Sequence, residues 1–164
     1  MTLELIIRPA SDFCETQREQ FKELVLKDPQ VQAGGLSGRI ANANYLAFLH
    51  LEGKLVGVNA IKNNRPYQQT LEASAGVELS DSDYLGEVGY LHVAKDYRRA
   101  RLADVLLLAT LAAAKGKGLF ATIQSTNIGS RRLFERHGFN QVGKSWPSKE
   151  VKDEVNLYVR GRQE

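Results

Sequence analysis

Hydrophobic and polar positions along the chain switch between the period of a strand and the period of a helix. Residues 2–8 predict a first strand, which Pro9 ends. The helix that follows begins at Ser11 or Asp12, both good N-cap residues, and runs to about Lys27. Its apolar side chains fall roughly on one face and are Phe13, Phe21, Leu24 and Val25.

The next part of the chain predicts a hairpin and then a long polar connection. Residues 45–51 and 54–62 have the pattern of two strands, joined at Glu52-Gly53, which is typical of a tight hairpin turn. Residues 63–83 are polar and show few regular features. Because a loop of this length is unusual in a compact domain, we expect it to be functional.

The remaining segments complete a mixed sheet with helices packed on it. They predict a loop with a short helix over 30–43, strands over 84–94 and 119–124, helices over 101–115 and 128–137 (the second ended by Gly138), and strands over 139–143 and 154–160. This order predicts an α+β fold, an α/β/α sandwich with a mixed sheet, as a single domain over residues 1–164. The order alone names no function.

Composition narrows the class of protein. A hydrophobic fraction of 43% and a charged fraction of 25% are ordinary for a globular domain of 164 residues. The net charge of +3 is too mild to indicate nucleic-acid binding. Cys14 is the single cysteine, and the N-terminus shows no signal-peptide pattern, so we expect a cytoplasmic location. The apolar run 105–114 is about half a membrane span, which predicts a buried helix and no membrane partner.

Three arginines stand at the start of that apolar run, in DYRRARLAD at residues 96–104. The first amides of a helix lack intrahelical partners, and they make a positive site where a phosphate can bind. Cations at this end oppose the helix dipole, so three of them together suggest a compensating anion. Solvated arginines at a helix end are the alternative interpretation.

Two motifs resemble the GCN5-related N-acetyltransferase (GNAT) family. LHVAKDYRRARLADVLL, at residues 91–107, is similar to the family's acetyl-CoA-binding motif. NIGSRRLFERHGF, at residues 127–139, is similar to its second CoA-contacting motif. The resemblance spans residues 84–139, and it implies a mostly antiparallel sheet with a splayed fourth strand and acetyl-CoA as cosubstrate.

The resemblance implies a diphosphate-binding loop after the fourth strand. In the family this loop reads Arg/Gln-x-x-Gly-x-Gly/Ala; here Arg98 matches the first position and Ala103 the last, while Arg101 stands where the first glycine belongs. Either the backbone at Arg101 stays in the ordinary helical region or CoA binding is weakened, unless its guanidinium adds a phosphate contact. The implied loop residues are Arg98, Arg99, Ala100, Arg101, Leu102 and Ala103.

The end of the fourth strand is implied to hold the pantetheine arm. Leu91, His92 and Val93 match the strand whose main chain pairs with the cosubstrate, and the Leu91 amide matches the group that polarises the thioester carbonyl. Strand alternation turns His92 away from its two neighbours. We therefore expect a structural role for the His92 side chain.

Glu87 is the candidate general base, since it lies four residues before Leu91, where several family members carry theirs. An amine acceptor is mostly protonated at neutral pH, and a carboxylate can take its proton before attack. The alternative is a surface residue at the start of a strand. Tyr90 is a second catalytic candidate, or an aromatic ring packed on the sheet.

The second motif adds Asn127, Ser130 and Arg131. Asn127 matches an asparagine that touches the pantetheine arm, and it is equally a good helix N-cap. Ser130 and Arg131 match positions near the CoA phosphates, although Arg131 can equally be solvated. Phe134 stands where many members have the tyrosine that protonates the leaving thiolate, and Ser125, Thr126 or His137 are open substitutes.

We therefore expect an N-acetyltransferase that transfers acetyl from acetyl-CoA directly to a primary amine of a small molecule or peptide. A weakened acyl-CoA-binding domain is the alternative, and a nucleic-acid module is disfavoured. We expect a monomer or homodimer and no metal site. Four acidic residues before the fourth strand form either a rim for a cationic amine or a merely polar surface: Glu72, Glu78, Asp81 and Asp83.

Overall fold

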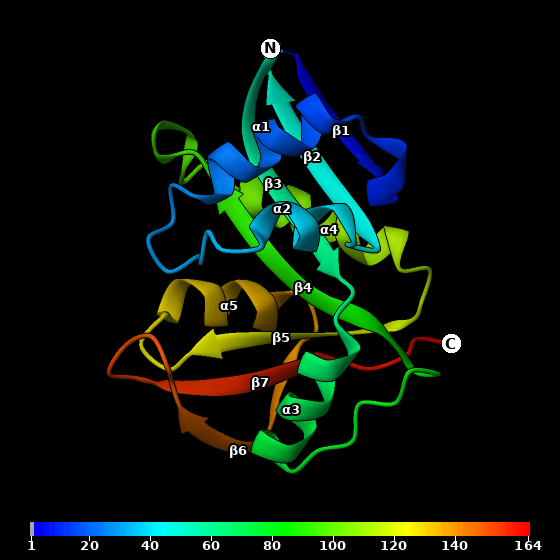
Figure 1. The fold of residues 1–164 in the computed structure, drawn as a ribbon, viewed down its shortest axis with the longest axis vertical. Coiled ribbons are helices and arrows are strands. Elements are labelled where there is room, and N and C mark those ends of the chain that lie inside the picture. Colours follow the sequence, from blue (N-terminus) through cyan, green and yellow to red (C-terminus); the bar gives the residue numbers. More distant parts are fainter. Residues whose placement is uncertain (1) are drawn as a thin grey trace. The chain divides into compact units, whose positions relative to one another are not determined.

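The computed structural model describes residues 2–164 and has seven strands and five α-helices in the described part (Figure 1). The elements are β1 (Leu3–Arg8), α1 (Glu15–Val25), α2 (Leu36–Ala41), β2 (Tyr45–Leu51), β3 (Lys54–Lys62), α3 (Arg65–Ala75), β4 (Tyr84–Val93), α4 (Leu102–Ala113), β5 (Gly118–Gln124), α5 (Ile128–Arg136), β6 (Asn140–Pro147) and β7 (Glu154–Arg160). Two short 3₁₀ turns precede α1 and α4, at Ala10–Asp12 and Lys95–Tyr97.

The strands form a mixed, mostly antiparallel sheet in the order β1-β2-β3-β4-β5-β7-β6. This confirms the expected fold class. The chain divides into two compact units, which we call the N-terminal unit (2–63 with 88–113) and the C-terminal unit (64–87 with 114–164). Strand β4 contributes its first four residues to the C-terminal unit and the rest to the N-terminal unit. The expectation of one domain stays a prediction.

In the N-terminal unit, β2 and β3 form the expected hairpin. Tyr45 pairs with Ile61 and Leu51 with Lys54, and β1 pairs with the other edge of β2. Glu52 and Gly53 both have positive φ, 50° and 78°. A two-residue turn of this kind matches the right-handed twist of the strands that it joins.

Helices cover both faces of the strands in the N-terminal unit. Leu46 and Phe48 of β2 belong to a cluster with α1 and α2, whereas Ala47 and Leu49 pack with Leu106 of α4. Figure 1 shows α1 and α2 lying across β2 and β3. Of the predicted apolar face of the first helix, Phe21, Leu24 and Val25 are confirmed as buried residues of α1, whereas Phe13, also buried, precedes the helix. Alternate side chains of β2 therefore bury opposite faces.

In the C-terminal unit, β4 pairs in parallel with β5 from Tyr84 to Glu87, and β7 runs antiparallel between β5 and β6. Helix α3 packs through Leu71 and Ala75 against Phe120 of β5 and Leu157 of β7. By strand alternation, Thr122 of β5 shares the face of Phe120.

The expectation of an irregular connection over 63–83 is wrong, because α3 occupies Arg65–Ala75. The Asn64 side chain accepts a hydrogen bond from the Tyr67 amide at 3.2 Å and so caps the first turn. Gly76 follows the last turn with φ 70°, which is the left-handed conformation that ends many helices. Polar residues fill most of the helix, so its apolar stripe is too thin to stand out in the sequence.

The other boundaries differ by a few residues. The first helix begins at Glu15 rather than at Ser11 or Asp12, which lie in a 3₁₀ turn. Leu36–Ala41 is the expected short helix within the glycine-rich segment. Strand β6 extends to Pro147, beyond the expected residue 143. Within residues 2–164, no helix is long and apolar enough to cross a membrane.

Candidate functional site

The loop between β4 and α4 has an unusual backbone. Arg99 has φ 69° and Arg101 has φ 59°, both in the left-handed region that side chains with a Cβ rarely adopt. Of the two possibilities for the backbone at Arg101, the ordinary helical conformation is wrong. Arg101 takes the conformation that glycine favours.

The backbone of this loop has the kind of conformation that favours anion binding. Left-handed residues interspersed with others turn successive backbone N–H groups toward one side, a geometry that binds phosphates. The loop leads directly into α4, whose helical bonding begins with the Val105 amide on the Arg101 carbonyl at 3.3 Å. The helix N-terminus adds its unpaired amides and the positive end of its dipole. The backbone of the loop and the positive end of the helix dipole therefore both favour a negatively charged ligand.

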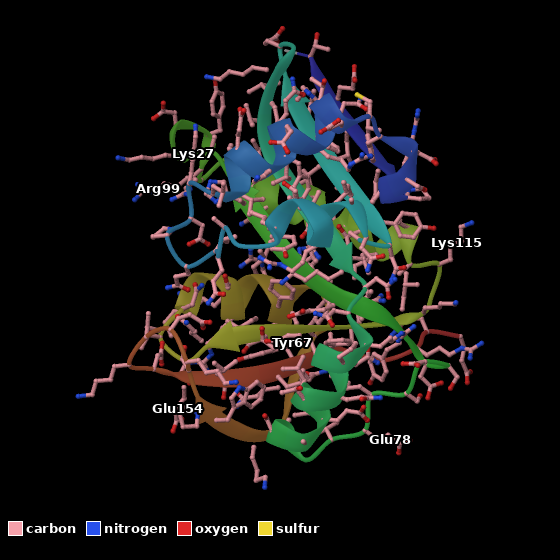
Figure 2. The ribbon with its side chains drawn as sticks, viewed as in Figure 1. Lys27, Tyr67, Glu78, Arg99, Lys115 and Glu154 are labelled. Atoms are coloured by element: carbon pink, nitrogen blue, oxygen red, sulfur yellow. The ribbon has the colours of Figure 1, made fainter. Side chains whose placement is uncertain are left out.

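The three arginine side chains of the loop differ in their constraints. Arg98 Nε donates to the carbonyl of Val93 at 2.9 Å, which fixes the loop to the end of β4. Arg99, labelled in Figure 2, and Arg101 are exposed. Ala100, also exposed, lies between these two residues. The loop thus presents exposed cations beside the backbone amides.

Tyr90 is a third left-handed residue, with φ 63° inside β4. Its hydroxyl accepts a hydrogen bond from Arg39 Nε at 3.2 Å, and Lys62 Nζ lies 4.2 Å from its ring centroid. Gly89 allows this arrangement, because a Cβ at residue 89 would collide with the Lys62 side chain. The ring also packs edge-on against Phe21. The packed-aromatic interpretation of Tyr90 is confirmed, and two cations adjoin the ring.

Arg39 also holds the loop between α1 and α2. Its two terminal nitrogens donate to the carbonyls of Gln32 and Gly34, each at 2.7 Å. One guanidinium therefore ties this loop to Tyr90 of β4. Sequence reasoning missed Arg39 and Lys62, since neither belongs to a motif and their contact with Tyr90 depends on tertiary packing.

The end of β4 places Leu91 and Val93 on the α4 side, where both pack with Leu106. His92 lies in a different environment. Burial lowers the pKa of His92, and Arg98 lowers it further, while Asp28 acts in the opposite direction. A neutral imidazole beside Arg98 is consistent with the expected structural role.

Glu87 is buried, with 6% of its surface exposed, so the alternative of a surface residue is wrong. Thr122 Oγ1 donates a hydrogen bond to Glu87 Oε2 at 3.3 Å. Burial, followed by the negative charge of Glu87, raises the pKa of Tyr67 of α3 to about 12, and a hydrogen bond with the Thr122 side chain acts in the opposite direction. Neither Tyr67 nor Thr122 was found from the sequence, because both belong to segments without a motif.

In the second motif, Asn127 caps α5. Its Oδ1 accepts the amide of Ser130 at 3.1 Å, which confirms the N-cap interpretation. Arg131 donates from Nε to the Tyr158 hydroxyl at 3.0 Å and from a terminal nitrogen to the Ser125 carbonyl at 3.1 Å. These bonds attach α5 to β7 and to the end of β5, which favours a structural role for Arg131.

Phe134 is a core residue. It is 5% exposed, and its ring packs edge-to-face on Phe139 with centroids 4.9 Å apart. A phenyl ring has no acidic proton to donate, and Phe134 serves to fill the apolar core. The acid that the resemblance associates with this position therefore has no counterpart at residue 134.

Three of the four acidic residues named before β4 are engaged in local structure. Glu72 accepts the Leu79 amide at 3.0 Å, Asp81 pairs with Arg65 at 2.6 Å, and Asp83 accepts from a serine hydroxyl three residues earlier at 2.9 Å. These bonds shape the connection between α3 and β4. They favour the interpretation of a polar surface over that of a rim for a cationic amine.

Comparison with protein-family models gives a match to the acetyltransferase (GNAT) family over residues 10–139. The chain belongs to the GNAT family. Comparison with curated protein sequences gave no match. The family assignment covers both motifs and all of the candidate site residues above.

Solved structures with this fold include several GNAT enzymes, all with low sequence identity. An acyl-CoA N-acyltransferase from Pseudomonas aeruginosa has a TM-score of 0.73 at 12% identity, covering 97% of this chain and 99% of that one. An IAA acetyltransferase from Bacillus cereus has 0.67 at 13%, covering 98% and 99%. Arabidopsis thaliana NAA60, solved with a bisubstrate analogue, has 0.66 at 16%, covering 96% and 98%. These likenesses show the fold.

GNAT membership implies an acyl-CoA substrate, and the loop before α4 fits its diphosphate. Arg99 and Arg101 have the left-handed backbone found in anion-binding loops, they directly precede α4, and both are exposed. Among residues 2–164, no cluster of three or more His, Cys, Asp or Glu side chains is arranged to hold a metal ion.

Proposed function

We propose that this GNAT protein is an N-acetyltransferase that moves the acetyl group of acetyl-CoA to a primary amine of a small molecule or peptide by direct transfer. The observation that carries the proposal is the left-handed backbone at Arg99 and Arg101. A residue with a Cβ adopts this conformation at a cost of about 1–2 kcal/mol, so the surrounding structure enforces it. We attribute this strained backbone to anion binding at the start of α4.

In this proposal the loop from Arg98 to Ala103 binds the CoA diphosphate through its amides. Arg99 and Arg101 add charge-assisted hydrogen bonds to phosphate oxygens. The main chain from Leu91 to Val93 pairs with the pantetheine arm, and Asn127 contributes its side-chain amide nitrogen from the start of α5.

Glu87 is proposed to remove the proton of the acceptor ammonium. The neutral amine then attacks the thioester carbon, and the Leu91 amide donates to the oxygen that becomes negative. Both groups belong to β4, four residues apart in the sequence. Burial excludes most water from the Glu87 side chain.

The CoA thiolate is proposed to leave without a proton from Phe134. A thiol of ordinary acidity has a pKa of about 8.5, so the thiolate is a good leaving group near neutral pH. An acyl-CoA-binding protein without turnover is the second candidate function, and the buried Phe134 is the observation that favours it.

A thiol-release assay with acetyl-CoA over a panel of primary amines tests the proposal. We expect turnover with at least one amine, and a loss of kcat of about 10²–10⁴-fold in Glu87→Gln. Glu78→Gln, a change of the same chemistry at an exposed position, is the matched control and keeps full activity.

Titration calorimetry with acetyl-CoA separates the two candidate functions. Binding without thiol release for any amine supports the acyl-CoA-binding protein. Absence of binding to acetyl-CoA would refute both. Undiminished turnover in Glu87→Gln would refute the assignment of the base.

A further inference from the structure

Two cationic side chains meet at Tyr90 in the N-terminal unit. Arg39 Nε donates to the Tyr90 hydroxyl at 3.2 Å, and Lys62 Nζ lies 4.2 Å from the centroid of the ring. The Lys62 side chain also lies directly against Gly89, where it occupies the space that a Cβ would need. Arg39 is exposed, and Tyr90 and Lys62 are half-buried. The two cations therefore form one positive site that borders solvent.

The guanidinium of Arg39 is held in place and still has hydrogens to donate. Its two terminal nitrogens each give one hydrogen to a backbone carbonyl, those of Gln32 and Gly34, both at 2.7 Å. Together with the bond to Tyr90, these contacts use three of the five N–H groups of an arginine. Among residues 2–164, no carboxylate accepts a hydrogen bond from Arg39. The two remaining hydrogens, one on each terminal nitrogen, suit the two oxygens of a carboxylate.

The backbone of β4 brings this positive site close to a group that the proposed function uses. Tyr90 has φ 63°, a left-handed conformation that the surrounding structure must enforce, and strain of this kind is concentrated at functional sites. The next residue is Leu91, whose amide is proposed to donate to the thioester oxygen. Because adjacent Cα atoms are about 3.8 Å apart, one small molecule can reach both residues.

The charge of the site selects among acceptors. An amine arrives mostly as an ammonium, which Arg39 and Lys62 repel. A carboxylate on the same molecule replaces this repulsion with attraction. A polyamine carries no such group, and neither does the amino end of a neutral peptide.

We propose that Arg39 and Lys62 bind a carboxylate of the acceptor, so that the substrate is a small amine that carries a carboxylate, as a free amino acid does. Arg39 supplies the hydrogen bonds, Lys62 adds positive charge, and the Tyr90 hydroxyl helps to hold the guanidinium in place. This inference rests on the proposed function and narrows its acceptor. It is opposite in charge to the cationic acceptor that the acidic residues before β4 suggest in the sequence.

Matched pairs of acceptors test the substrate class in a thiol-release assay with acetyl-CoA. Each pair consists of an amino carboxylate and its primary amide, which have nearly the same shape and differ by one charge. Glycine, β-alanine and γ-aminobutyrate, each with its amide, vary the separation between amine and carboxylate. Spermidine and a short neutral peptide represent the other acceptor classes. We expect kcat/KM for the best carboxylate to exceed that of its amide by about 10–100-fold, the effect of charge-assisted hydrogen bonds.

Variants of the two cations test the assignment of residues. Arg39→Gln should raise the KM for the carboxylate by about 10–100-fold, with kcat and the KM for the amide nearly unchanged. Arg39→Lys keeps the charge without the planar fork and should restore part of the preference. Lys62→Met keeps the apolar stem against Gly89 and should weaken the preference by a smaller factor. Arg18→Gln is the matched control, because Arg18 also donates to a backbone carbonyl, that of Phe13, within the N-terminal unit.

The ratio of kcat/KM between a carboxylate and its amide separates recognition from structure, and circular dichroism verifies that each variant folds. If Arg39→Gln lowers both values alike, Arg39 has only a structural role and the inference is wrong. A wild-type preference for an amide, for spermidine or for the peptide would also overturn it, although turnover would still support the proposed function. If none of these acceptors releases thiol, the proposed function fails and this inference fails with it.

Discussion

The left-handed backbone at Arg101 makes a prediction about stability that opposes the usual behaviour of glycine. At φ 59°, a residue with a Cβ costs about 1–2 kcal/mol, whereas glycine adopts this conformation freely. The extra freedom of glycine in the unfolded chain offsets about 0.5–1 kcal/mol of that gain. We therefore expect Arg101→Gly to be about 0.5–1 kcal/mol more stable than Arg101→Ala, because both variants lose the guanidinium but only alanine keeps the steric cost.

Arg132 supplies the matched control, because it is exposed and lies within α5. In a helix interior glycine is about 1 kcal/mol less favourable than alanine. The order of the two variants should thus reverse: glycine is the more stable at position 101 and alanine at position 132. Using one pair of residue types at both sites cancels the effect of removing an arginine.

Urea unfolding gives the free energy of unfolding of all four variants, and the comparison requires that the m value is the same within each pair. A difference of 1 kcal/mol corresponds to about 2–4 °C in Tm for a chain of this size. If Arg101→Ala proves as stable as Arg101→Gly while the control pair behaves as expected, the backbone at position 101 is not left-handed in solution. The argument for a preformed diphosphate loop would then fail.

Three further predictions concern stability. Because the pKa of His92 lies below its usual 6.5, the unfolded chain binds a proton more readily than the folded chain, so the free energy of unfolding should fall as pH drops below about 6.5. In His92→Gln the urea midpoint should depend less on pH in this range. An unchanged pH dependence would contradict the prediction. Gly143→Ala should lower stability by about 2–4 kcal/mol in urea unfolding, since Gly143 has φ 69° and a Cβ would collide with the Ala75 carbonyl; a change under 1 kcal/mol would contradict this. Thr110→Val should cost about 1–3 kcal/mol by the same measurement, because the buried Asn59 Nδ2 loses its acceptor at 2.8 Å; a neutral effect would show that Asn59 finds another partner.

The sequence predicts the strands along the chain and the helices α1, α4 and α5 because their apolar positions repeat with a clear period. The hairpin at Glu52-Gly53 is confirmed for a local reason, since the turn type follows from two adjacent residues. Helix α3 was missed although Asn64, Pro66 and Gly76 mark its ends. Those signals lie in a polar segment, in which the few apolar residues do not show a clear helical period.

The candidate site was predictable only where residues act through local backbone. The loop at residues 98–103 belongs to one motif, and its direction into α4 follows from chain order. Thr122 and Tyr67 meet Glu87 through pairing of β4 with β5 and packing of α3. Contacts of this kind depend on register and on helix placement, which a single sequence does not encode locally.

The position of β7 has a consequence for synthesis of the chain. This strand, Glu154–Arg160, lies between β5 and β6, yet it is the last of the three to leave the ribosome. A nascent chain that ends before residue 154 therefore holds two strands whose common partner does not yet exist. Each would expose unpaired backbone groups, the kind of edge that invites pairing with another chain. Synthesis of residues 154–160 thus gives both strands their shared partner, and deletion of this segment should leave β5 and β6 each with an unpaired edge.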